Sequence, residues 1–289
     1  MSYDFHSELS NEYLSIFENS KYSDVTIKVG KGNNPKEFKA HSFVLKVRSK
    51  FFEKEIKKKE NSNSSNNNVT LFIREDFNFE AFEYVLKYLY SGSFNLVSKD
   101  INFILDMLVI SEFINLIILI NVLQKYLVEK RKKELDNYFS IVHKTCSKCQ
   151  SFEELRTYCD KTAQLYPTTI FKADDFTTLD KDLLIFILEN KKNKLYEIQK
   201  WDYIIKWGIT QNSSPLPEIS SSSSSIHNTS LWSKANFRDL SVTLKPIIGL
   251  IDFKKISSKD FCNKVKPFKK IFERTYYDEL LVSQLGGGN

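Results

Sequence analysis

The chain is poor in glycine and has no long apolar run. Its 289 residues include 8 Gly but 23 Phe. Scarce glycine and abundant large apolar side chains favour packed helices over a strand-rich barrel or a disordered chain. The most apolar stretch, residues 113–123, has eleven residues, whereas a membrane-spanning helix needs about twenty. We therefore expect no membrane partner, and we interpret this stretch as a buried core helix.

Cysteine is also scarce, and its pattern does not suggest a secreted, disulfide-stabilised protein. Cys146, Cys149, Cys159 and Cys262 are the only four in the chain. The N-terminal stretch MSYDFHSELSNEYL is polar and carries acids, so we expect no secretory signal. A long chain without such a signal keeps its thiols reduced. These features predict a cytoplasmic or nuclear location.

Charge of one sign dominates only weakly. There are 42 Lys and Arg side chains against 36 Asp and Glu, which gives a net charge of +6. The denser basic segments are residues 57–59, 130–133 and 264–270. No aromatic stacking motif accompanies them, so we interpret them as solvated helix ends and expect no nucleic-acid partner.

Signatures of catalysis and of cofactor binding are missing. The sequence has neither a Gly-x-Ser-x-Gly elbow nor a glycine-rich phosphate loop, and its four histidines are widely dispersed. His143, Cys146, Cys149 and Cys159 form the one candidate zinc set, because Cys-x2-Cys is a zinc-ligand spacing. The favoured interpretation is that these cysteines are structural and bind no metal, because Cys159 falls on the core-facing stripe of a predicted helix. We therefore predict no catalytic residue, no metal and no cofactor.

The first half of the chain mixes helices and strands. Leu9, Tyr13, Ile16 and Phe17 recur at helical spacing, and alternation of apolar and polar residues over residues 25–29 then marks a strand. Phe38 and Ala40 fall on its predicted partner strand, after a turn at residues 30–35. Further strands are predicted at residues 69–73 and 94–97. Helices are predicted at residues 7–20, 77–90 (ended by Gly92), 101–108 and 111–128.

The second half shows helical patterns alone. Helices are predicted at residues 135–143, 152–164, 167–171, 178–188, 195–209, 237–247, 257–264 and 270–281. Between them, residues 213–230 form a serine-rich segment, interpreted as a surface loop and alternatively as a phosphorylated tail or linker. We therefore predict two domains, residues 1–130 and 131–285, with a tail at 286–289.

Several segments of the first domain together resemble a BTB/POZ domain. SDVTIKVG (residues 23–30) contains Asp24, and KEFKAHSFVLKVRSKFFEKEI (residues 36–56) contains His41. YVLKYLYSGSF (residues 84–94) and MLVISEFINL (residues 107–116) complete a likeness that runs from Leu9 to Leu127. The resemblance implies an α+β fold, a small sheet flanked by helices, that pairs with itself and recruits other proteins.

The second domain resembles the all-α BACK domain that follows BTB in many adaptor proteins. The resemblance rests on three segments: FEELRTYCDKTA (residues 152–163), KWDYIIKWGITQ (residues 200–211) and ISSKDFCNKVKPFKKIF (residues 256–272). The chain looks most similar to fungal and protist BTB-BACK adaptors, some of which continue into a TLDc domain.

The resemblance implies a non-enzymatic, dimeric adaptor for protein–protein interaction. Its expected role is that of a substrate adaptor of a cullin-RING ubiquitin ligase, which binds a cullin and an unidentified client protein. The alternative is an oligomerisation scaffold or regulatory protein without ligase contact.

Two sets of residues are predicted to carry this function. The homodimer interface is predicted to place the N-terminal stripe of one chain against α-helical residues of its partner: Leu9, Tyr13, Ile16 and Phe17 against Phe43, Val44 and Val47. The partner-binding face is predicted to comprise Phe52, Ile56 and Lys58. Cullin-binding relatives often carry Glu at the position of Lys58, so the charge is reversed here.

Overall fold

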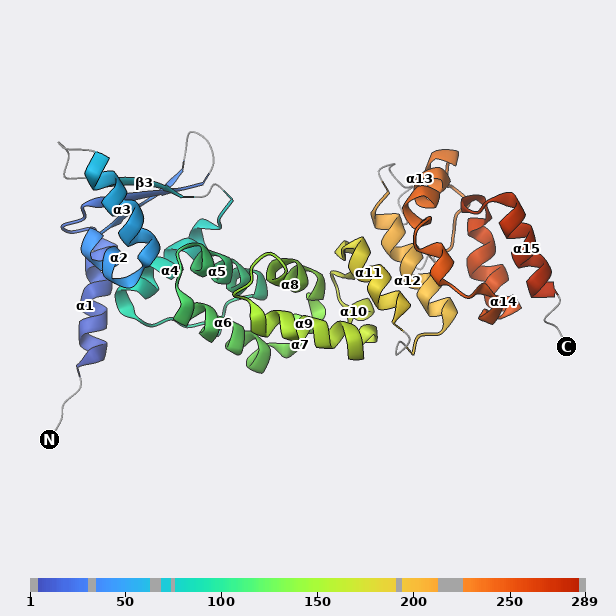
Figure 1. Cartoon of the computed structure of the whole chain (residues 1–289), viewed down its shortest axis with the longest axis horizontal. Helices are drawn as coiled ribbons and strands as arrows, with labels where there is room; N and C mark the ends of the chain where they lie inside the picture. Colours follow the sequence, from blue (N-terminus) through green and yellow to red (C-terminus); the bar gives the residue numbers. More distant parts are fainter. Residues whose placement is uncertain are drawn as a thin grey trace. The chain divides into compact units, whose positions relative to one another are not determined.

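The computed structural model describes residues 5–30, 35–62, 69–73, 76–190, 194–212 and 226–285. The chain divides into two compact units (Figure 1). The N-terminal unit comprises residues 1–135 and 145–156, and the C-terminal unit comprises residues 136–144 and 157–289. Within the described ranges, no helix is long and apolar enough to cross a bilayer.

A three-stranded sheet in the order β2-β1-β3 forms the centre of the N-terminal unit. Its strands are β1 (Val25–Val29), β2 (Lys36–Ala40) and β3 (Val69–Ile73). β1 pairs antiparallel with β2, placing Val25 opposite Ala40, and parallel with β3, placing Val25 opposite Val69. Alternate residues of β1 are buried, as the sequence alternation predicts.

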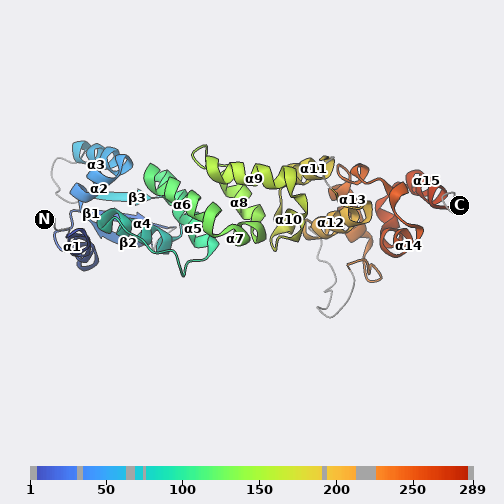
Figure 2. The ribbon, with the colours of Figure 1, turned by 90° about the horizontal axis from the view of Figure 1, so that it is seen from below.

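Helices flank this sheet, as Figure 2 shows for the blue and green segments. The helices of this unit are α1 (His6–Asn19), α2 (Ser42–Arg48), α3 (Lys50–Ser62), α4 (Phe79–Ser91), α5 (Ile101–Phe113) and α6 (Ile117–Lys130). α7 (Lys132–Asn137) follows and is shared with the C-terminal unit. Asn78 caps α4 by accepting backbone N–H bonds, and Gly92 ends it with φ of 69°, as predicted. Most of the predicted turn at 30–35 lies outside the described residues.

Two predicted elements differ from the structure. Residues 94–97 are not a strand, because the Tyr84 hydroxyl bonds both the N–H and the carbonyl of Asn95. Residues 113–123 are not one helix, because Asn115 adopts a left-handed conformation (φ 60°) between α5 and α6. Asn tolerates that conformation better than most residues. The break leaves Ile117 and Ile118 exposed at the start of α6.

In the described part of the C-terminal unit, the regular elements are all helical. They are α8 (Phe139–Cys146) and α9 (Glu153–Leu165), each shared with the N-terminal unit, then α10 (Pro167–Lys172), η1 (Phe176–Thr178), α11 (Lys181–Glu189), α12 (Glu197–Thr210), α13 (Lys234–Leu244), η2 (Ile248–Leu250), η3 (Phe253–Lys255), α14 (Ser258–Asp260), η4 (Phe261–Val265), η5 (Lys266–Ile271) and α15 (Arg274–Leu285). Of the predicted serine-rich loop at residues 213–230, residues 213–225 lie outside the described residues.

The core of the C-terminal unit is built around α12. Trp201 is fully buried, stacks on Phe272, and donates its indole N–H to the Lys264 carbonyl at 3.1 Å. Gly208 faces α13, where an added Cβ would lie 2.8 Å from the side chains of Leu240 and Leu244. This close approach sets the spacing between the two helices.

An ionic cluster attaches the segment before α13 to α12. Asp202 contacts His227 at 2.9 Å and Lys264 at 2.6 Å. Burial alone would raise the pKa of Asp202, but the hydrogen bonds from His227 and Lys264 lower it below its usual value. The Thr229 hydroxyl adds a 3.0 Å bond to the Pro267 carbonyl. These contacts hold His227 and Thr229, in the described end of the serine-rich segment.

Asp202→Asn should make the protein less stable at neutral pH and flatten its acid dependence. A carboxylate whose folded pKa is lowered stabilises the fold above its unfolded pKa, and this stabilisation is lost as pH falls through the folded value. We expect a loss of about 1–3 kcal/mol at pH 7, shrinking below about pH 4. Urea unfolding from pH 7 to pH 3 measures this. An equal loss at every pH would contradict the assignment.

Candidate protein-interaction surface

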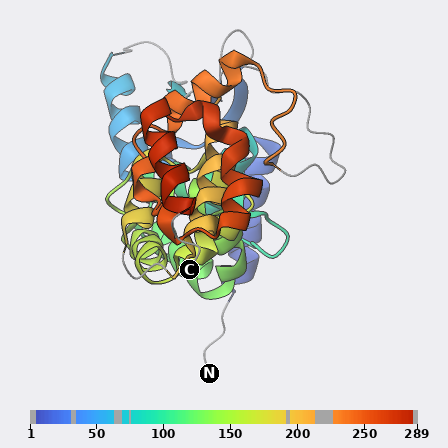
Figure 3. The same ribbon diagram turned by 90° about the vertical axis from the view of Figure 1, so that its right-hand side faces the viewer.

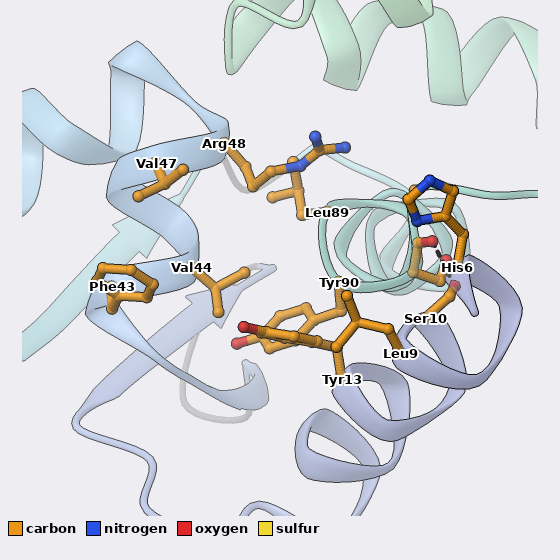
Figure 4. A pocket seen from close by; sticks show the side chains of 12 residues that line it. His6, Leu9, Ser10, Tyr13, Phe43, Val44, Val47, Arg48, Leu89 and Tyr90 are labelled. Carbon is orange, nitrogen blue, oxygen red and sulfur yellow. Dashed lines mark hydrogen bonds between the residues drawn. The ribbon is translucent and has the colours of Figure 1, made fainter. Parts of the chain in front are cut away.

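An apolar groove of about 350 Å³ opens between α1, α2 and the end of α4 (Figure 4). We call it the dimer groove. Leu9 and Tyr13 approach it from α1, while Phe43, Val44 and Val47 face it from α2. The other lining residues are His6, Ser10, Arg48, Leu89, Tyr90, Ser91 and Gly92. Five of the seven residues predicted for the dimer interface therefore meet at one surface.

Large apolar side chains on this groove are strongly exposed. Phe43 is 71% exposed, Val47 69% and Leu9 51%. They come from two helices far apart in sequence, so they form one patch only in the folded unit. An exposed patch of this kind typically marks a site of association with another protein.

Packing against α4 holds α1 in place beside the groove. The Ser10 hydroxyl donates to the Ser91 carbonyl at 2.5 Å, and Glu18 pairs with Lys87 at 3.4 Å. Burial alone would lower the pKa of Lys87, but hydrogen bonds and charge attraction from Glu83 and Glu18 raise it. α1 is therefore part of its own domain and not only a projecting arm.

Phe17 and Ile16 do not lie where the dimer prediction places them. Phe17 is 7% exposed and packs on Tyr90 of its own domain, with ring centroids 4.8 Å apart. Its predicted role as a partner contact is therefore wrong, because α4 already covers it. Ile16 is half-buried and does not line the groove.

A hydrogen-bond network fixes the start of α2. Asp24 accepts from the Ser42 backbone N–H at 2.7 Å and from its hydroxyl at 2.5 Å. The Tyr90 hydroxyl accepts from the His41 backbone N–H at 2.8 Å and lies 2.9 Å from His41 Nδ1. His41 Nε2 lies 2.5 Å from the Lys21 carbonyl, which can only accept, so Nε2 is the donor. Burial raises the pKa of Tyr90.

A second groove of about 490 Å³ adjoins the first and is called the lateral groove here. It lies among the α2–α3 junction, α4 and the start of α6. Ile117 and Ile118 are 64% and 75% exposed on it. The remaining lining residues are Lys46, Val47, Arg48, Ser49, Lys50, Glu53, Tyr88, Asn115, Leu116 and Leu119. Val47 and Arg48 line both grooves, so the two surfaces are continuous.

A short apolar run in the sequence indicates the lateral groove, although it shows no helical periodicity. Four apolar residues in succession, Ile117 to Ile120, spread around a helix at about 100° each. One core cannot cover all four directions, so some of them must be exposed. Buried Ser49 closes the base of this region by donating to the Ile114 carbonyl at 2.7 Å.

The predicted cullin-binding face on α3 is largely inaccessible. Phe52 and Ile56 are each 0% exposed and belong to the domain core. Their predicted role as an exposed apolar anchor is wrong, because helical spacing identifies a shared face without saying whether that face points inward. Lys58 is exposed. Neighbouring Lys57 pairs with Glu53 at 2.6 Å, and its hydrogen bond lowers the pKa of Glu53.

The cysteines of the candidate zinc set occupy structural positions. Cys159 is 0% exposed on α9, which confirms its predicted place in the core, and Cys146 is 1% exposed. Arg156 donates to the backbone carbonyls of Cys146 and Cys149. Burial lowers the pKa of His143. Among the described residues, no three His, Cys, Asp or Glu side chains form a group that could hold a metal ion.

Comparison with known proteins finds a family match within the N-terminal unit. Residues 13–130 match the family model of the BTB/POZ domain. Among solved structures, the chain is similar to the BTB domain of zebrafish PATZ1, with 16% identity and a TM-score of 0.35. That match covers 45% of this chain and 99% of the zebrafish chain.

Ile56→Asp should unfold or strongly destabilise the protein, since it buries a carboxylate without a partner in an apolar core. We expect a loss of about 3 kcal/mol or more in the free energy of unfolding. Lys58→Asp, on the exposed side of the same helix, should change it by less than about 0.5 kcal/mol. Urea denaturation compares the two variants. A stable Ile56→Asp protein would restore the idea of an exposed apolar face.

Proposed function

Residues 13–130 form a BTB/POZ domain, a protein-interaction module, and on this premise we propose that the chain is a non-enzymatic, homodimeric adaptor. The observation that carries the proposal is the dimer groove, where two separate helices present exposed apolar side chains. In this proposal, the groove associates with the same groove of a second copy, and the lateral groove takes a different partner.

A two-fold contact explains why α1 and α2 are both exposed at the groove. In an isologous interface, the patch of one protomer meets the same patch of its partner, so each helix of a pair can cover the other. Leu9 and Tyr13 on α1 are then positioned to pack on Phe43 and Val47 of the partner subunit. Burial of these side chains would supply the main driving force, because apolar burial dominates obligate interfaces.

The lateral groove suits an amphipathic helix that carries acids. Ile117 and Ile118 offer an apolar floor, and Arg48 and Lys50 lie exposed at its edge. Lys46 is occupied by Glu60 at 2.6 Å. A helix laid in such a groove would bury its apolar side and direct carboxylates towards the two remaining cations.

Attachment to a cullin-RING ubiquitin ligase is the finer form of this proposal. The burial of Phe52 and Ile56 removes them from any direct contact, so a cullin would meet the exposed side of α3, including Lys58. The BACK-like C-terminal unit and an unidentified client complete the adaptor. The alternative remains a scaffold that dimerises without ligase contact, which the exposed lysines of α3 favour.

Leu9→Asp combined with Val47→Asp should convert a dimer into a monomer, because two charges would enter an apolar contact. Light scattering at micromolar concentration measures the mass. Val97→Asp is the matched control, since Val97 is 85% exposed in the same unit but away from the groove. It should remain dimeric. A parent protein that is monomeric at every concentration would contradict the proposal.

Lys58→Glu should strengthen cullin binding if the ligase role is right, since it restores the carboxylate that cullin-binding relatives often carry. Lys54→Glu, one turn earlier on α3, makes the same charge change and should have a smaller effect. Calorimetry with a cullin N-terminal domain compares both with the parent. Absence of binding by the parent and by Lys58→Glu would leave the scaffold as the function.

A further inference from the structure

The basic excess of the chain is concentrated in its last described segment. Residues 226–285 hold eleven Lys and Arg side chains against six Asp and Glu, an excess of five, while the whole chain has an excess of six. Figure 3 views this segment, in orange and red, at the front of the C-terminal unit. The charge therefore belongs mainly to one part of the fold.

Helical geometry brings part of this charge into a line along α13. Lys234, Arg238, Ser241 and Lys245 follow a spacing of four, three and four residues, so they lie within about 60° of one another around the helix. Lys234, Arg238 and Lys245 are exposed. The core side of α13, with Leu240 and Leu244, faces away from this line.

η5 runs beside the same side of α13. The Ser241 hydroxyl, within the line, donates to the Ile271 carbonyl at 2.7 Å. Lys270 places its ammonium group 4.8 Å from the ring centroid of Phe237. Lys266, Lys269 and Lys270 are exposed on η5, which contacts α13, and we group them with the cations of α13 as one cationic face. Its members are Lys234, Arg238, Lys245, Lys266, Lys269 and Lys270.

These six charges are not neutralised within the described part of the chain. The ion pairs of this region involve other residues: Lys264 with Asp202, and Lys255 with Asp252. Asp278 and Glu279 line a separate groove with residues 251–254. Asp239 lies on the other side of α13 from the line of cations. Like charges that lie side by side repel one another, and together they attract an anionic partner.

We propose that this cationic face binds an acidic polypeptide segment. Along α13, Lys234 and Arg238 are about 6 Å apart and Arg238 and Lys245 about 10.5 Å. Alternate side chains of an extended peptide are about 6.6 Å apart, so two carboxylates at alternate positions can meet Lys234 and Arg238. The inference does not depend on the proposed dimer, since it concerns the C-terminal unit.

The surroundings of the face favour a polypeptide over other polyanions. Single-stranded nucleic acids use aromatic side chains for stacking, but the large exposed apolar neighbours here are aliphatic, Leu231 and Val242. Membrane-surface helices need a continuous apolar face opposite the cations, and on α13 that side is buried in the unit. Two isolated aliphatic side chains instead suit contact with single apolar residues of a peptide.

Fluorescence anisotropy of a labelled polyglutamate peptide with the full chain tests the proposal. Lys234→Glu with Arg238→Glu should weaken binding about tenfold, because attraction becomes repulsion. Lys254→Glu with Lys259→Glu is the matched control, an equal charge change at exposed positions of the same unit, and should stay within about twofold if position matters more than net charge. Lys234→Gln with Arg238→Gln should give an intermediate loss.

Unlabelled single-stranded oligonucleotide and phosphatidylserine vesicles serve as competitors. The proposal is supported if both compete less well than unlabelled polyglutamate. It is overturned if the parent does not bind, if the control pair loses as much affinity as the test pair, or if either competitor binds more tightly. Melting temperature verifies that each variant is folded. Light scattering should give the same mass for parent and variants, so failure here leaves the dimer proposal unaffected.

Discussion

The interaction surface of the N-terminal unit depends on the hydroxyl of Tyr90. It accepts from the His41 backbone where α2 begins, while the Tyr90 ring packs on Phe17 of α1. Through the His41 ring, the same network reaches the Lys21 carbonyl in the turn between α1 and β1. One side chain from α4 therefore fixes both walls of the dimer groove. The Ser10 bond to Ser91 holds α1, and the Asp24 bonds to Ser42 hold the start of α2, but Tyr90 contacts both helices.

Much of the fold could be predicted from periodicity because burial imposes it locally. The alternation in β1 and the stripe of α4 each reflect one face in contact with a core. The two errors have different causes. Tyr84 bonds the backbone of Asn95 where the pattern predicts a strand, and this contact depends on a tertiary neighbour. Asn115 takes a left-handed conformation after the end of α5 and interrupts a mostly apolar stretch that the pattern assigns to one helix.

The sequence identifies which apolar residues share a helix face, but it does not say whether that face points to the core or to solvent. Phe43 and Val47 are exposed as the dimer prediction requires, but Phe52 and Ile56, spaced four apart on the next helix, form the core. The spacing is the same kind of signal in both helices. The two pairs differ because α3 packs against β3, which buries Phe52 and Ile56. Arg48, shared by both grooves, carries no periodic signal at all.

The two surfaces differ in the force that would operate on them. The dimer groove presents aliphatic and aromatic side chains, so its association would gain from kosmotropic salt, which strengthens apolar burial. The cationic face presents lysines and an arginine in water, where attraction extends over a Debye length of about 10 Å at 0.1 M salt and shortens as salt is added. Rising ionic strength would therefore release an acidic segment from the C-terminal unit while leaving self-association intact. An adaptor of the proposed kind would hold its own copy persistently and exchange a charged partner, because the two contacts respond to different properties of the solvent.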